Sequence, residues 1–72
     1  MKILNKIVYK DGGTTKYITD NDLQFCLDNR ILSKTKNRWY LGYPGKQEST
    51  ILESDNFLLV QFLEVLEHYE DK

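Results

Sequence analysis

The C-terminal segment, residues 56–71, is the feature that most restricts the fold of this chain. It contains neither Gly nor Pro, and it follows Ser54 and Asp55, a pair that favours a helix N-terminus. At about 100° per residue its apolar side chains cover an arc of roughly 160°, whereas a helix packed on one small sheet needs only about 100°. The residues of this arc are Leu58, Leu59, Phe62, Leu63, Val65, Leu66 and Tyr69. The segment therefore predicts an amphipathic helix with a wide apolar arc. Either one flank of the arc meets a second chain, or the small domain wraps the helix more fully.

The size of the chain explains why surplus apolar surface matters. With 72 residues, 40% of them hydrophobic, the chain predicts one folded domain over residues 1–72 and excludes a disordered tail. A core of this size supplies only about 3–5 kcal/mol, so small domains are often stapled or oligomeric. The single cysteine excludes an internal disulfide, and no Cys/His cluster predicts a structural metal. Close packing and self-association therefore remain as the ways in which this chain can be stabilised.

The N-terminal third predicts a β-hairpin. Residues 3–10 alternate in a period of two with β-branched and aromatic side chains, and residues 14–18 form a matching second run. Between them Asp11-Gly12-Gly13 supplies the Asp-Gly dipeptide that hairpin turns favour.

The middle of the chain predicts a short helix and further strands. Residues 20–29 combine capping residues with Leu23, Cys26 and Leu27 at helical spacing, which indicates a short helix. Ile31-Leu32, the polar turn at 33–37 and residues 38–43 are interpreted as strand, turn and strand, and residues 46–50 as a loop. The predicted fold class is α+β: an antiparallel sheet of three to four strands covered by the C-terminal helix.

The sequence offers little catalytic chemistry. His68 is the only histidine, and Cys26 on an apolar stripe is interpreted as a small buried hydrophobe. No nucleophile elbow, metal-ligand spacing or phosphate-binding glycine motif occurs. We therefore expect a protein that is not an enzyme and has no metal and no cofactor. The apolar runs are too short for a membrane span, and the start has no signal-peptide pattern, so a cytoplasmic location is expected.

Charge is distributed unevenly along the chain. Residues 1–46 carry nine Lys/Arg against four Asp/Glu, whereas residues 47–72 carry one against seven. A basic and aromatic segment within the first part is a candidate for weak nucleic-acid binding, by neutralising phosphates and stacking on bases. Its residues are Arg30, Lys34, Lys36, Arg38, Trp39 and Tyr40. The overall pI of about 5.7 is low for such a module, and Lys and Arg on a hairpin more often protect a sheet edge from pairing. The charge asymmetry also fits two complementary surfaces, within one monomer or between two.

Three segments carry a resemblance to a known family over essentially the whole chain. They are the opening Met1-Lys2-Ile3-Leu4-Asn5-Lys6-Ile7-Val8-Tyr9-Lys10, the Arg38-Trp39-Tyr40-Leu41 strand and the terminal helix at 56–69. In these segments the chain resembles the small Bacillus prophage YopT family, which is unrelated to the Yersinia protease of that name. The resemblance implies a homodimer whose subunits have about three strands and one principal helix, with no assigned activity.

The function predicted from the sequence is a non-enzymatic, self-associating interaction module of phage or prophage type. The terminal helix is expected to provide core and dimer contacts together, through Leu59, Phe62, Leu63, Leu66 and Tyr69. The alternative is the weak nucleic-acid-binding module described above.

Overall fold

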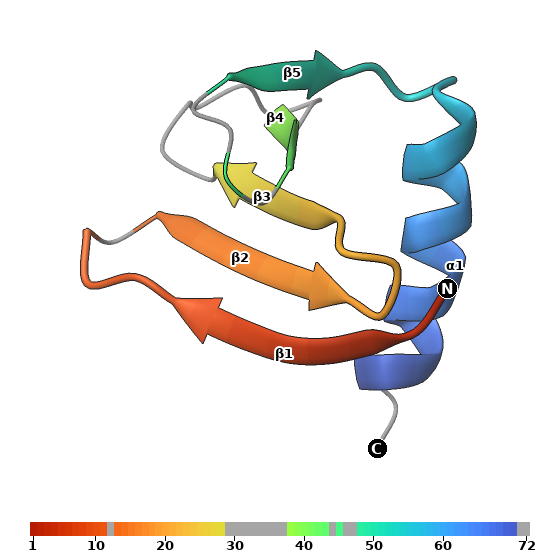
Figure 1. The fold of residues 1–72 in the computed structure, drawn as a ribbon, viewed down its shortest axis with the longest axis horizontal. Helices are drawn as coiled ribbons and strands as arrows, with labels where there is room; N and C mark the ends of the chain where they lie inside the picture. Colours follow the sequence, from red (N-terminus) through yellow and green to blue (C-terminus); the bar gives the residue numbers. More distant parts are fainter. Residues whose placement is uncertain (12, 29–37, 44, 46–47, 71–72) are drawn as a thin grey trace.

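The computed structural model of the chain is an antiparallel sheet of five strands with one helix packed against it (Figure 1). It describes residues 1–11, 13–28, 38–43, 45 and 48–70. The strands lie side by side in chain order, and the helix crosses them on one face. The elements are β1 (Ile3–Val8), β2 (Thr14–Thr19), β3 (Gln24–Asp28), β4 (Arg38–Gly42), β5 (Ser49–Leu52) and α1 (Phe57–Glu70). The predicted α+β class is confirmed, but the sheet has five strands where three to four were expected and the resemblance implied about three.

The predicted N-terminal hairpin is confirmed. Strands β1 and β2 pair in antiparallel fashion, and the Tyr9 N–H extends the pairing by donating to the Thr14 carbonyl at 3.0 Å. The Asp11 carboxylate stabilises the turn because it accepts hydrogen bonds from the N–H groups of Gly13 and Thr14, at 3.0 and 2.9 Å. The Asp-Gly signal therefore marked both the turn and its stabilising side chain.

The short helix predicted over residues 20–29 is wrong, because the structure has a tight turn followed by β3. The Thr19 N–H donates to the Leu23 carbonyl, and Asp22 adopts φ = 62°, a left-handed conformation that Asp tolerates better than most residues. Residues that cap helices also favour turns, so the local signal was ambiguous. Phe25 resolves it: the side chains of Phe25 and Leu27 alternate with Cys26, which is the period of a strand.

The expected loop at residues 46–50 also needs correction at its C-terminal end. Ser49 and Thr50 belong to β5, where they pair with Gly42 and Leu41 of β4. Only Leu52 of this strand is buried, so the segment lacks the alternation of buried side chains by which strands are recognised. The predicted strand at 38–43 is confirmed as β4, whereas Ile31, Leu32 and the turn at 33–37 lie outside the described residues.

The hydrophobic core lies between the sheet and α1, and Phe62 is at its centre. The Phe62 ring stacks on Phe25 of β3, with 4.1 Å between centroids and 4° between ring planes. It also meets Tyr17 of β2 and Trp39 of β4, each at 5.5 Å between centroids. One helical side chain thus joins three strands. The core residues as a group are Ile3, Tyr17, Phe25, Trp39, Leu41, Leu52, Leu59 and Phe62.

The predicted C-terminal helix is confirmed as α1, with its N-terminus capped by Asn56. The Asn56 side-chain oxygen accepts hydrogen bonds from the N–H groups of Leu58 and Leu59, at 3.0 and 3.3 Å. The capping function therefore belongs to Asn56 and not to the preceding Ser54 and Asp55. This cap fixes where the helix begins and hence which side chains face the sheet.

Replacing Phe62 with Ala should lower the free energy of unfolding by about 3–5 kcal/mol, because the substitution removes a completely buried ring and leaves a cavity. Chemical denaturation at low protein concentration measures this change. The neighbouring Leu63→Ala is the matched control, because Leu63 is 37% exposed and should cost about 1 kcal/mol or less. Equal losses for the two variants would contradict the helix orientation.

Candidate interaction surfaces

The structure divides the predicted contact residues of the helix between core and surface. Leu59 and Phe62 are buried against the chain's own sheet. Leu66 and Tyr69 are half-buried and pack on the edge of the same core, whereas Leu63 is exposed over 37% of its surface. Of the predicted residues, Leu63 is therefore the one with the most surface left for another molecule.

Beside Leu63 the helix exposes further apolar residues that the sequence analysis did not select. Phe57 is 76% exposed and Val60 is 42% exposed. Phe57, Val60 and Leu63 are spaced three residues apart and therefore form one stripe along the helix. Glu64 and Glu67 lie at the C-terminal end of this stripe. We call these five residues the helix patch. An apolar stripe edged by carboxylates is suited to a partner surface that is itself apolar and basic.

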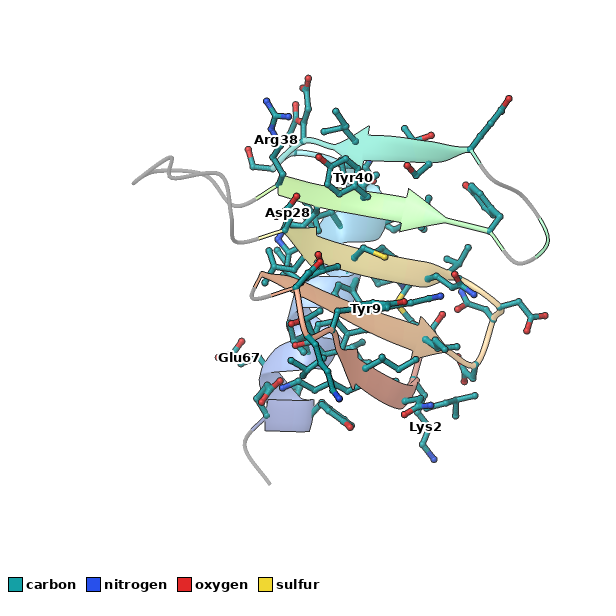
Figure 2. All side chains as sticks on the ribbon, turned by 90° about the vertical axis from the view of Figure 1, so that its left-hand side faces the viewer. Lys2, Tyr9, Asp28, Arg38, Tyr40 and Glu67 are labelled. Carbon is teal, nitrogen blue, oxygen red and sulfur yellow. The ribbon has the colours of Figure 1, made fainter. Side chains whose placement is uncertain are left out.

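The face of the sheet turned away from α1 carries a second surface (Figure 2). One row of paired positions crosses all five strands on this face: Ile7, Lys16, Cys26, Tyr40 and Ile51. Four of these five residues are largely apolar, although the solvent face of an antiparallel sheet is usually polar. Among the described residues no helix or strand covers this row.

Arg38 lies on this same face, two residues before Tyr40 on β4 (Figure 2). We call Ile7, Lys16, Arg38, Tyr40 and Ile51 the sheet patch. Ile51 is 55% exposed and Arg38 is exposed, whereas the other three residues are half-buried. The sheet patch thus has an apolar floor with two cationic groups.

Within the predicted basic and aromatic segment, the structure separates the residues that it describes. Arg38 and Tyr40 share the sheet patch, but Trp39 points to the opposite face, is 7% exposed and packs against Phe62. Arg30, Lys34 and Lys36 lie outside the described residues. Trp39 is therefore a core residue and has no ring surface for stacking on a base.

A shallow hollow of about 320 Å³ lies over the sheet near Cys26 and Tyr40. Its other lining residues are Thr14, Asp28 and Ser49. Burial raises the pKa of the Cys26 thiol above its ordinary value, although nearby Lys16 acts in the opposite direction. A thiol with a raised pKa stays protonated near neutral pH, which does not favour nucleophilic chemistry. The described residues also contain no group of three or more His, Cys, Asp or Glu side chains arranged to hold a metal ion.

Polar contacts fasten the C-terminal end of α1 to the sheet. The Lys6 ammonium lies 3.0 Å from the Glu70 carboxylate, and the Tyr17 hydroxyl donates to the same carboxylate at 3.3 Å. The hydrogen bond from Lys6 lowers the pKa of Glu70, and the hydrogen bond to Glu70 raises the pKa of Lys6. Burial raises the pKa of Tyr17. Because Lys6 and Glu70 are solvent-exposed, this pair orients the helix end and makes a small contribution to stability that depends on pH.

The two edge strands carry features that discourage pairing with another sheet. Strand β1 has a register irregularity between Ile3 and Asn5, and its Lys6 points toward the helix side, where it meets Glu70. Strand β5 is only four residues long. Bulges, inward charges and short strands are known means of protecting sheet edges. The helix patch and the sheet patch are therefore better candidates for contact than either edge.

Sequence reasoning missed Ile7, Lys16 and Ile51 as members of one surface. Ile7 and Lys16 were assigned to strands correctly, but nothing local shows that the pairing of β1 to β4 aligns them with Tyr40, or that β5 adds Ile51. Once the strand order is known, their positions follow from the period of two. The missing information was the pairing register, and not the identity of the residues.

Comparisons with known proteins give no relative: no protein family model matches the chain, and neither the curated proteins nor the solved structures contain a match. Among the described residues, no helix is both long enough and apolar enough to cross a membrane. The two exposed patches are therefore the features of this chain that point to a function.

Glu70→Gln should weaken the pH dependence of folding stability in acid. Since the folded-state pKa of Glu70 lies below its ordinary value of 4.5, its contribution is present above that value and is lost as the pH falls through the folded-state pKa. Thermal unfolding of the parent and the variant from pH 7 down to about pH 3 measures the difference. Glu53→Gln, which removes a glutamate outside both patches, is the matched control. A Glu70→Gln curve parallel to that of the parent across this range would contradict the assignment.

Proposed function

We propose that this chain is a non-enzymatic interaction module that associates with itself through the helix patch. The observation that carries the proposal is the exposed stripe of Phe57, Val60 and Leu63 on a helix whose opposite side is already fully used by the core. Contiguous apolar side chains on a small domain mark contact surfaces, and their removal from water favours association by about 25 cal/mol per Å².

Several further points support the proposal. The surplus apolar arc of this helix was evident from the sequence, and the chain is so short that burial against a second copy would add substantially to its stability. A homodimer is also what the resemblance to the prophage YopT family implies. The absence of activity in the proposal is supported by the raised pKa of the Cys26 thiol and by the position of His68 on the exposed helix surface.

Light scattering coupled to size-exclusion chromatography over a dilution series should give a mass of at least twice the 8.5 kDa of one chain. Phe57→Ser should shift the population toward the monomer, because it removes the most exposed apolar side chain of the stripe. The effect expected for a central aromatic contact is a tenfold or greater weakening, which corresponds to about 1.4 kcal/mol or more.

The matched control is Val8→Ser, which removes a 68% exposed apolar side chain outside both patches. It should retain the mass distribution of the parent. A parent chain that stays monomeric at every concentration would overturn the proposal, as would a Phe57→Ser variant that associates like the parent.

A weak nucleic-acid-binding module is the second candidate function. The observation in its favour is that Lys16, Arg38 and Tyr40 share one face of the sheet. A cationic sheet face with an aromatic ring can neutralise phosphates and stack on an unpaired base. The burial of Trp39 leaves a single tyrosine in the sheet patch for stacking, so this candidate ranks below self-association.

If the second candidate holds, a fluorescent single-stranded oligonucleotide should bind at 50 mM salt and lose affinity steeply at 200 mM salt, because bound phosphates release counterions. Tyr40→Ala and Arg38→Gln should each weaken that binding. If self-association alone is the function, anisotropy should show no binding at either salt concentration.

A further inference from the structure

We infer that the surface receiving the helix patch is the sheet patch of a second copy of the chain. This inference rests on the proposed self-association and specifies its geometry: the helix of one copy lies across the open sheet face of another. Glu67 lies on the helix, while Arg38 and Tyr40 lie on the sheet, so the two surfaces belong to different layers of the fold (Figure 2).

The charges of the helix patch call for a basic partner surface. Helix α1 contains three glutamates and no lysine or arginine. Glu70 is paired with Lys6, but no described residue forms an ion pair with Glu64 or Glu67. These two carboxylates lie beside the apolar stripe, where a docked surface would bring its own charges against them.

The charges of the sheet patch are of the opposite sign. Lys16 and Arg38 supply two cationic groups, and no described residue forms an ion pair with either. Asp28, the register partner of Arg38, lies on the same face and leaves its net charge positive. Ile51 and the half-buried Ile7 and Tyr40 provide apolar surface for the stripe of Phe57, Val60 and Leu63.

The two patches also match in length and direction. The row from Ile7 to Ile51 crosses five strands, which corresponds to about 19 Å at the usual spacing of neighbouring strands. Phe57 and Glu67 are ten residues apart on one helix, or about 15 Å along its axis. Helix α1 already crosses the strands of its own sheet (Figure 1), and a helix from a second copy would repeat that arrangement on the opposite face.

Contacts between like patches are disfavoured by charge. Two helix patches would bring Glu64 and Glu67 of both copies together without a basic residue on either helix. Two sheet patches would oppose Lys16 and Arg38 of both copies. Because like charges repel when an interface brings them together, contact between unlike patches is preferred.

Charge reversal on each surface tests this geometry. One variant, Glu64→Lys with Glu67→Lys, makes the helix patch basic, and the other, Lys16→Glu with Arg38→Glu, makes the sheet patch acidic. Each variant alone should self-associate at least about tenfold more weakly than the parent, because like charges then meet. An equimolar mixture of the two should recover association, since every contact between the variants again joins opposite charges. Sedimentation equilibrium measures all four samples.

The matched control for net charge is Glu48→Lys with Glu53→Lys, which alters the charge as much as the helix-patch variant does but lies outside both patches. It should associate like the parent. Thermal melting verifies that each variant is folded. If a reversal variant unfolds, the neutral pair Lys16→Gln and Arg38→Gln replaces it and should also weaken association.

The outcomes separate the inference from the proposal on which it rests. A parent chain that never associates overturns both. A parent that associates while the sheet-patch variant is unaffected indicates contact between helix patches and overturns the inference alone. If the helix-patch variant associates like the parent, the inference is likewise overturned, and contact between two sheet patches is indicated. If the sheet-patch variant loses only oligonucleotide binding, the basic face serves nucleic acid and the inference is wrong.

Discussion

The stacking of Phe62 on Phe25 is the contact on which the rest of the structure depends. A five-stranded sheet without a cover would expose Tyr17, Phe25 and Trp39 to water, and it is the ring of Phe62 that meets all three. This contact fixes the rotation of α1 about its axis. It thereby determines that Leu59 faces the core and that Phe57 and Val60 face solvent. The surface available to another molecule is thus a consequence of how the core is packed.

The sequence was most informative where a segment had one dominant period and a clear end signal. The terminal helix combined an apolar arc with the absence of Gly and Pro, and the first hairpin combined alternation with Asp11 and Gly12, so both were predicted correctly. The helix predicted over residues 20–29 was wrong because the same side chains that cap helices also form turns. Leu23, Cys26 and Leu27 fit a helical period, whereas the alternation through Phe25 fits a strand. Which pattern is followed depends on pairing with a neighbouring strand, and local sequence does not reveal that pairing.

The candidate surfaces were predictable only in part, for a related reason. Leu63 lay on an apolar arc, but the arc alone does not show where the sheet stops covering the helix, and so Phe57 and Val60 were not selected. Arg38 and Tyr40 were selected together with Trp39, which the pleat directs to the core. Alternation along one strand separates such neighbours in principle, whereas the assembly of Ile7, Lys16 and Ile51 around Tyr40 requires the register of all five strands.

The order of the strands bears on how the chain reaches its native state. Every strand pairs with its neighbour in sequence, so the sheet is built entirely from short-range hairpins and is synthesised before the helix that covers it. On the ribosome the ring of Phe25 and its neighbours remain exposed to water until Phe62 has been synthesised. During this time the protected edges of β1 and β5 limit pairing with other nascent chains. The core therefore cannot close before α1 is available, because Phe62 is the side chain that joins β2, β3 and β4.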